Sequence, residues 1–241
     1  RLLADLRRCE VLAEPVGGLI ANLADLVGGL ELRRRIAQIE VAVADNVTAL
    51  VLRVLDAPPA ADLDALRDFE KRHGIELYLQ SGGLDTVTPL SPPATPLRYE
   101  LDGLAAGIEF TPTDFIQVNG ELNRRMIGCA IELLGPQPGD RALDLFCGLG
   151  NFSLPLALKV ATVTGVEGDA ALVARARSNA ARNGIGNAEF HAANLAADLS
   201  QAPWAKQPYE RVLLDPPRAG AREVLPLIAA CRPRRIVYVS C

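Results

Sequence analysis

Acidic residues and glycines follow two predicted strands in the second half of the chain, where they could bind a small polar ligand. Residues 144–151 read Asp-Leu-Phe-Cys-Gly-Leu-Gly-Asn, and Glu167 ends the next predicted strand. Glycines let the backbone turn tightly and approach a ligand closely. An acid at the end of the second strand of such a unit accepts hydrogen bonds from ribose hydroxyls. Either feature alone also fits a tight turn or a surface acid, but together they favour an adenosyl ligand.

Two further predicted strands end in residues with more specific chemistry. One is followed by Asp215-Pro216-Pro217-Arg218, and the last ends at Cys241. The prolines also fit an ordinary turn after a strand, and a buried cysteine is commonly a packing residue. A thiol at a strand end beside a cofactor pocket nevertheless fits a pyrimidine C5 methyltransferase. Its thiolate would add to C6 of uracil, C5 of the resulting enolate would attack a sulfonium methyl, and a base would remove the C5 proton so that the thiol is eliminated.

Alternating strands and helices must position these residues. We expect strands over residues 141–146, 161–166, 188–191, 212–215 and 235–240, and helices over residues 119–134, 152–158, 169–183 and 221–230. This alternation predicts an α/β fold with a doubly wound parallel sheet. Ligands of such sheets bind at the carboxyl ends of the strands, which is where the acids, the glycines and the last cysteine fall.

The first part of the chain has a different pattern. We expect a helix over residues 12–30, two strands over residues 39–44 and 48–55 joined by a turn, a helix over residues 61–73 that ends at a glycine, and a strand over residues 75–79. The sequence therefore predicts a small central α+β domain over residues 1–110, followed by a catalytic domain over residues 111–241.

Composition restricts the class of protein. The 241 residues are 49% hydrophobic and 22% charged, which allows a packed core and argues against disorder. The formal net charge of -4 gives no overall attraction to nucleic acid, so a basic surface can only be local. No apolar stretch of the length of a membrane span and no secretory signal pattern is present. The five cysteines are widely spaced, and we interpret them as reduced thiols in a cytoplasmic protein.

Five segments together resemble the RNA uracil-C5 methyltransferases, and among them the bacterial branch that modifies 23S rRNA. These segments are residues 115–119 (Phe-Ile-Gln-Val-Asn), 144–151, 166–168, 215–220 and 236–241. The resemblance implies a Rossmann-like, S-adenosylmethionine-dependent methyltransferase fold. It also implies methylation of C5 of a uridine in 23S rRNA, with that RNA as the partner.

The resemblance also implies roles for individual residues. Cys241 matches the nucleophile of the family. Six further positions match residues around S-adenosylmethionine: Gln117, Phe146, Asn151, Glu167, Asn194 and Asp215. Glu167 would hold the ribose, Asn194 would lie beside the adenine, and Asp215 would line the reaction centre. Three other cysteines match no catalytic position and are expected to be packing residues: Cys129, Cys147 and Cys231.

Cys9 has a separate implication. Followed by Glu-Val-Leu-Ala-Glu-Pro, it looks like the fourth ligand of the [4Fe–4S] cluster of this family. One cysteine cannot hold such a cluster, which needs four thiolates or their equivalents. The other three ligands, an OB-like RNA-binding domain and the glutamate that serves the family as proton base have no counterpart in the chain. We therefore expect a chain truncated at both ends, free of the cluster in this form and weakly active or inactive, from a longer iron–sulfur protein.

Other functions stay open on these residues. A tRNA uracil-C5 methyltransferase would use the same chemistry, although the surroundings of Cys9 favour the rRNA branch. A methyltransferase of base amines is disfavoured by Arg218, which stands where those enzymes carry an aromatic residue, and by Cys241. A non-catalytic RNA-binding protein with a degenerate fold is disfavoured by the intact acids and glycines. We expect a monomer with no membrane association.

Overall fold

A computed structural model describes residues 6–240 and divides them into two units. One unit extends to Arg98 and also includes Thr111–Asp114. The other contains Tyr99–Phe110 and continues from Phe115. Residues 99–110 therefore group with the second unit, whereas the predicted catalytic domain begins at residue 111. The assignment of a central and a catalytic role to the two parts stays a prediction.

The first unit is an α+β layer structure. Its sheet has the order β1-β2-β3-β4, with β1 (Ile36–Val43), β2 (Thr48–Val54), β3 (Glu76–Gln80) and β4 (Val87–Pro89). β1 and β2 are antiparallel, β2 and β3 are parallel, and β3 and β4 are antiparallel. Side chains of α1 (Ile20–Gly29) and α2 (Ala60–His73) share a buried core with β2 and β3, to which Leu23, Leu52, Phe69 and Leu77 belong. The predicted α+β architecture is confirmed.

Local chemistry explains where the elements of this unit begin and end. The predicted turn between β1 and β2 is present, because the Ala44 amide donates to the Val47 carbonyl at 2.9 Å. α2 ends at Gly74, which takes the left-handed conformation (φ 62°) that a glycine adopts at low cost. The predicted helix over residues 12–30 is too long: a 3-10 turn spans Val16–Leu19 and the α-helix begins at Ile20. Pro15 lacks an amide donor, and the two glycines that follow weaken helix formation.

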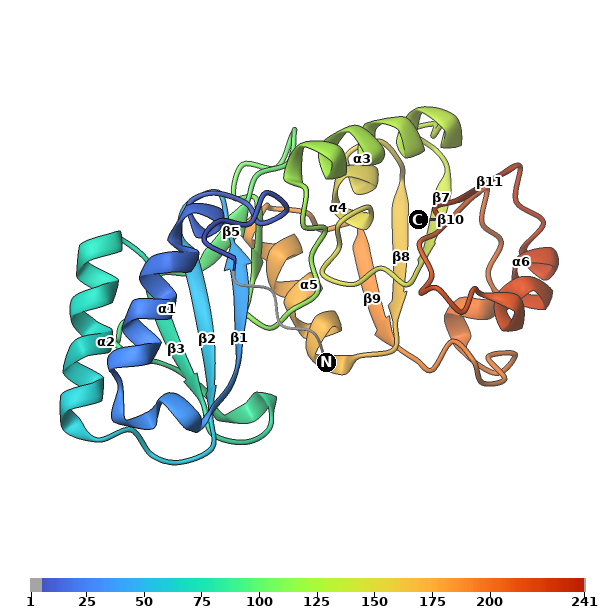
Figure 1. Ribbon diagram of the computed structural model, residues 1–241. Helices are drawn as coiled ribbons and strands as arrows, with labels where there is room; N and C mark the ends of the chain where they lie inside the picture. The colour runs from blue at the N-terminus through green and yellow to red at the C-terminus, as the bar shows by residue number, and fades with distance from the viewer. Residues whose placement is uncertain (1–5, 241) are drawn as a thin grey trace. The chain divides into compact units, whose positions relative to one another are not determined.

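The second unit is built on a five-stranded parallel sheet (Figure 1). The order is β11-β10-β7-β8-β9, and each neighbouring pair is parallel. The strands are β7 (Arg141–Leu145), β8 (Thr162–Glu167), β9 (Ala188–Ala192), β10 (Arg211–Leu214) and β11 (Arg235–Tyr238). The direction of strand addition reverses between β7 and β10, which makes this the switch point of a doubly wound sheet. The predicted topology is confirmed.

One helix precedes these strands and three lie between them, close to where the sequence predicts helices. They are α3 (Gly120–Leu134), α4 (Ser153–Ala157), α5 (Ala170–Arg182) and α6 (Leu225–Cys231). Asn119 caps the start of α3, because its Oδ1 accepts the Leu122 amide at 2.9 Å. The helix predicted over residues 221–230 is divided into a 3-10 turn, Arg222–Val224, and the α-helix, because Pro226 fits the first turn of a helix and not its interior.

Short elements complete the structure. A two-stranded sheet pairs β5 (Leu97–Tyr99) with β6 (Ile108–Phe110), and 3-10 turns span Glu31–Arg34, Leu84–Thr86 and Pro203–Lys206. No helix in the described part of the chain is long and apolar enough to cross a membrane.

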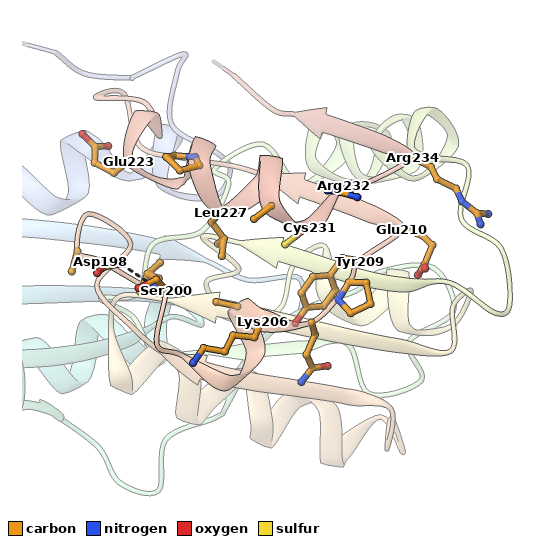
Figure 2. Close-up of a pocket in the computed structure, with 17 residues that line it drawn as sticks. Asp198, Ser200, Lys206, Tyr209, Glu210, Glu223, Leu227, Cys231, Arg232 and Arg234 are labelled. Atoms are coloured by element: carbon orange, nitrogen blue, oxygen red, sulfur yellow. Dashed lines mark hydrogen bonds between the residues drawn. The ribbon is translucent and has the colours of Figure 1, made fainter.

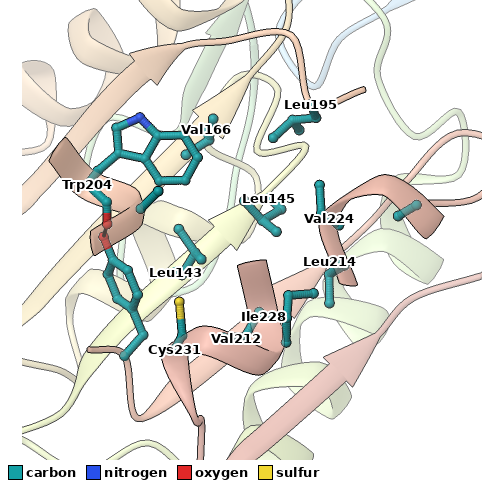
Figure 3. Packing of buried hydrophobic residues seen from close by; sticks show 13 residues of the cluster. Leu143, Leu145, Val166, Leu195, Trp204, Val212, Leu214, Val224, Ile228 and Cys231 are labelled. Carbon is teal, nitrogen blue, oxygen red and sulfur yellow. Dashed lines mark hydrogen bonds between the residues drawn. The ribbon is translucent and has the colours of Figure 1, made fainter. Parts of the chain in front are cut away.

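Both faces of the sheet in the second unit are buried. Leu143 and Leu145 of β7 join Trp204 and Ile228 in a core cluster that packs under α6 (Figure 3). Asp144 lies between these leucines in sequence and receives a hydrogen bond from Ser153 of α4. Because successive residues of a strand point to opposite faces, α4 and α6 cover opposite sides of β7. Both faces contribute apolar residues to the core, and the face toward α4 also places the carboxyl group of Asp144 near the strand ends.

Candidate active site

The parallel strands of the second unit end at one level. Leu145 of β7 pairs with both Val166 of β8 and Leu214 of β10, and Leu214 pairs with Tyr238 of β11. Val166 in turn pairs with His191 of β9. The residues that follow each strand are therefore neighbours along one edge of the sheet, although they come from distant parts of the sequence.

A cavity of about 1250 Å³ lies at this edge. It is lined by residues from the ends of β7, β8, β10 and β11, from the loop after β9, and from residues 115–117. The structure brings six predicted residues together around it: Gln117, Phe146, Asn151, Glu167, Asn194 and Asp215. Tyr238, Val239 and Ser240 line the same cavity. Cys241, the predicted nucleophile, lies outside the described residues.

The glycine loop after β7 is shaped by left-handed backbone. Phe146 (φ 66°), Gly148 (φ 52°) and Gly150 (φ 93°) all have positive φ angles. Two of these positions are glycines, which adopt that region easily, but for Phe146 the conformation is uncommon and costly. This geometry turns the loop back over the strand ends, and the Phe146 and Cys147 amides both donate to the Val166 carbonyl of the neighbouring strand.

Glu167 links the loops of two neighbouring strands. Its Oε2 accepts the Gly148 amide at 3.1 Å, while Oε1 accepts the amides of Gly168 at 2.6 Å and Asp169 at 3.2 Å. Backbone donors thus hold the carboxylate at the rim of the cavity. A carboxylate oxygen has more than one acceptor site, so Glu167 can still accept hydrogen bonds from a ligand.

Acids dominate the electrostatics of the cavity. Glu167, Asp215 and Glu223 line it, and Arg218 is the one cation among its described lining residues. Beneath them Asp144 is completely buried, and burial, reinforced by the nearby charges of Asp215 and Glu167, raises its pKa to about 7. Burial also raises the pKa of Asp215. A cationic ligand would relieve the mutual repulsion of these carboxylates.

Asp144 has one satisfied and one unsatisfied oxygen. Ser153 Oγ donates to Oδ2 at 2.5 Å, whereas Oδ1 is buried without a hydrogen-bond partner among the residues that the structure describes. An unpaired buried polar atom is costly and is uncommon away from functional sites. Asp144 is not among the residues that line the cavity, so a bound cation would act on this carboxyl group through its charge and not through direct contact.

Sequence reasoning missed three aromatic residues of the cavity. Tyr99, Phe115 and Tyr238 line it, and 78% of the Phe115 surface is exposed. Phe115 and Tyr238 fall inside segments that carry the family resemblance, so their place in those motifs was the available signal. Tyr99 lies in a strand of three residues that no periodicity could reveal.

A second cavity of about 790 Å³ lies between α6 and residues 197–210 (Figure 2). None of the predicted site residues lines it. Its described charged residues are balanced, with three acids and three bases: Asp198, Glu210, Glu223, Lys206, Arg232 and Arg234. Figure 2 shows these residues distributed around the rim, while Leu227, Cys231 and Tyr209 lie nearer the middle.

The cysteines have different surroundings. Cys147 and Cys231 are buried, and burial raises the pKa of both thiols, so they fit the predicted packing role. Cys129 on α3 is exposed, and its predicted packing role is wrong. Cys9 is half-buried and free. Within residues 6–240, no group of three or more possible metal ligands is assembled, so these residues alone do not fit an iron–sulfur cluster.

The fold defines the class of protein. The structure superimposes with a TM-score of 0.72 on the Pyrococcus abyssi tRNA (uracil-54, C5)-methyltransferase solved with S-adenosyl-L-homocysteine, covering 100% of this chain and 61% of that chain at 18% identity. The predicted Rossmann-like methyltransferase fold is therefore confirmed. The tRNA (uracil-5-)-methyltransferase family matches residues 98–241, and the chain belongs to that family.

Curated bacterial proteins are similar over the whole chain. The chain is 49% identical over 241 residues to the 23S rRNA (uracil(1939)-C(5))-methyltransferase RlmD of Xanthomonas campestris pv. campestris strain 8004. It is 50% identical to the protein of the same name from Xylella fastidiosa strain 9a5c. In both comparisons it covers 54% of the relative, so the chain spans about half the length of these proteins.

Proposed function

We propose that this chain forms the cofactor-binding part of an enzyme that methylates C5 of a uridine in 23S rRNA, with S-adenosylmethionine as the methyl donor. The observation that carries the proposal is the convergence of Gln117, Phe146, Asn151, Glu167, Asn194 and Asp215 on one cavity. Similarity to the RlmD proteins along the whole chain supports rRNA as the substrate.

The residues around the cavity fit the proposed cofactor. S-adenosylmethionine supplies an electrophilic methyl group on a sulfonium, so it carries the positive charge that an acid-rich cavity favours. Glu167, at the end of the second strand of the βαβ unit, would accept hydrogen bonds from the ribose. Asn194 would lie by the adenine and Asp215 by the reaction centre. Gln117, Phe146 and Asn151 would complete the surroundings of the cofactor.

The uracil chemistry is assigned to Cys241. Its thiolate would add to C6, and the electrons of the C5–C6 double bond would move to make C5 nucleophilic toward the methyl group. After methyl transfer, a base takes the C5 proton, the double bond forms again and the thiolate leaves C6. The preceding Tyr238–Ser240 segment lines the cavity, which supports placing this chemistry at that end of the site.

We further propose a [4Fe–4S] cluster with Cys9 as one ligand, which the family resemblance implies. The proposed cytoplasmic location rests on the interpretation of the cysteines as reduced thiols, and we also propose a monomer. The tRNA uracil-C5 alternative has less support, because the tRNA enzyme above is 18% identical to the chain while the RlmD proteins are 49% and 50% identical.

A covalent trap tests the reaction. The full-length protein is incubated with S-adenosylmethionine and 23S rRNA fragments in which uracil is replaced by 5-fluorouracil. Fluorine at C5 prevents the final proton removal, so the protein–RNA adduct should accumulate and be detected by denaturing electrophoresis. Cys241→Ala should form no adduct. Cys129→Ala, which changes an exposed cysteine on α3, should form as much adduct as the unmodified protein.

The outcomes separate the alternatives. An adduct that forms equally well with Cys241→Ala, or no adduct at all, would contradict the proposed mechanism. Methyl transfer to an exocyclic amine without an adduct would support the amine methyltransferase instead. An adduct with fluorinated tRNA and none with fluorinated 23S rRNA would support a tRNA uracil-C5 methyltransferase instead.

A further inference from the structure

Three polar side chains form a hydrogen-bonded network at the wall of the cavity. Tyr99 of β5 donates its hydroxyl to Asn151 Oδ1 at 3.0 Å. Asn123 of α3 donates its amide nitrogen to the same oxygen at 3.0 Å, and Asn151 Nδ2 donates back to Asn123 Oδ1 at 2.9 Å. Asn123 is 4% exposed, whereas Tyr99 and Asn151 line the cavity.

The network determines what Asn151 can offer a ligand. An amide oxygen accepts two hydrogen bonds and an amide nitrogen donates two. Both acceptor sites of Asn151 Oδ1 are occupied, by Tyr99 and Asn123, and one of its two N–H groups is occupied by Asn123. The capacity that Asn151 has left is one N–H donor. A ligand group that meets Asn151 must therefore be a hydrogen-bond acceptor.

The order of the strands indicates which part of the cofactor meets this donor. In the proposed site, the adenine lies by Asn194 after β9 and the ribose by Glu167 after β8. β7 is the next strand of the sheet, and Asn151 belongs to the loop that follows it. An extended ligand that runs from β9 over β8 reaches β7 with its amino-acid part, whose carboxylate is a strong acceptor.

We propose that Tyr99 is a positioning residue for cofactor selectivity: by donating to Asn151 Oδ1, it makes Asn151 present an N–H group to the carboxylate of the cofactor. Asn123 supports the same orientation from α3. The inference rests on the cofactor site proposed above. It assigns to Tyr99 an effect on ligands that carry the amino-acid part and no effect on ligands that lack it.

The test compares two probes by isothermal titration calorimetry on the full chain. S-adenosylhomocysteine carries the amino-acid carboxylate, whereas 5′-methylthioadenosine has the same adenosine but no amino-acid part. In Tyr99→Phe only the hydroxyl is lost, and Asn151 keeps its reciprocal pair with Asn123, which is satisfied equally well when both amides are flipped, so the orientation of the free donor is no longer unique. Loss of one such hydrogen bond should weaken S-adenosylhomocysteine binding about fivefold and leave 5′-methylthioadenosine within about twofold of its original affinity.

Tyr209→Phe is the matched control. The Tyr209 hydroxyl donates to the Trp204 carbonyl at 2.8 Å, at the wall of the second cavity (Figure 2). This variant also loses the hydroxyl of a tyrosine of the same unit, but it should keep the affinity ratio of the two probes. Fluorescence of Trp204, the single tryptophan of the chain, confirms that each variant is folded before titration.

A double-mutant cycle tests whether Tyr99 acts through Asn151. Asn151→Ala should lower the preference for S-adenosylhomocysteine, and adding Tyr99→Phe to it should lower that preference no further. Equal weakening of both probes in Tyr99→Phe, no change in either, or additive effects in the double variant would overturn the inference while leaving the cofactor site intact. If the unmodified chain binds neither probe, the proposed cofactor site itself is wrong.

Discussion

The two cavities of the second unit differ less in size than in how they are built. The first holds about 1250 Å³ and the second about 790 Å³, so either could admit a small molecule. The first lies where the ends of parallel strands meet, and left-handed backbone and backbone amides shape its rim. The second lies between α6 and the segment before β10, and its acids and bases balance.

The floor of the second cavity belongs to the hydrophobic core. Ala205, Tyr209 and Cys231 line it and are also members of the core cluster under α6. In the first cavity the buried group below the floor is the carboxyl of Asp144, which has an unpaired oxygen. Volume alone therefore does not mark a binding site. Converging strand ends, the left-handed backbone of the glycine loop and the excess of acids in the lining mark the first cavity, whereas packing of the core explains the second.

The largest expected effect concerns the pH dependence of stability. Burial raises the Asp144 pKa from 3.8 to about 7, so between these pH values the folded chain holds a proton that the unfolded chain releases. The free energy of unfolding should fall as the pH rises from about 4 to about 7, in total on the order of 4 kcal/mol. Asp144→Asn should remove most of this fall, and the smaller part that remains comes from Asp215, whose pKa burial also raises. Urea unfolding, followed by Trp204 fluorescence at several pH values, measures it.

For an acid of the second cavity, the free energy of unfolding should change with pH in the opposite direction. Asp198 is exposed, and hydrogen bonds from Ser200 lower its pKa. Its contribution to stability is therefore present above the ordinary pKa of an aspartate. That contribution is lost as the pH falls through the lowered pKa. Asp198→Asn should therefore leave the fall between pH 4 and pH 7 intact. If Asp144→Asn and Asp198→Asn have the same pH profile, the contrast between the two cavities fails.

The next variant should lower the free energy of unfolding without changing the affinity for S-adenosylhomocysteine. Ile228 of α6 is 4% exposed and packs in the core cluster beside the second cavity (Figure 3). Ile228→Ala should lower the free energy of unfolding by about 3 kcal/mol, because it removes buried methyl groups and leaves a cavity. Affinity for S-adenosylhomocysteine, measured by calorimetry under conditions where the variant is folded, should stay within about twofold. A tenfold loss of affinity would show that the core under α6 also supports the first cavity.

Sequence alone could predict the strand-end residues because local pattern and topology agree there. Glu167 and Asp215 each follow a short apolar run, and the rule for parallel sheets brings such positions to one edge. Tyr99 could not be predicted in this way, since its role depends on a hydrogen bond to Asn151, 52 residues away in sequence. The exposure of Cys129 likewise depends on what packs against α3, which the periodicity of the helix does not specify.

The smallest expected effect compares one glutamate from each cavity. Glu167 and Glu210 both accept backbone amides, Glu167 from Gly148 and Glu210 from Arg141 at 2.8 Å. Replacing either by glutamine keeps one acceptor oxygen and removes the charge. Glu167→Gln should weaken S-adenosylhomocysteine binding about tenfold, or about 1.4 kcal/mol. The single oxygen of the carboxamide cannot accept hydrogen bonds from both the glycine loop and a ribose hydroxyl as the two oxygens of the carboxylate can.

Glu210→Gln is the control for this effect, since Glu210 lines only the second cavity. It should change the affinity for S-adenosylhomocysteine less than twofold, because screening and distance leave a small effect of a remote surface charge. Competition with 5′-methylthioadenosine, which shares the ribose, should show the same tenfold loss for Glu167→Gln. If the two variants weaken binding alike, the acids act through the overall charge of the unit, and the position of Glu167 at the end of β8 has no special role.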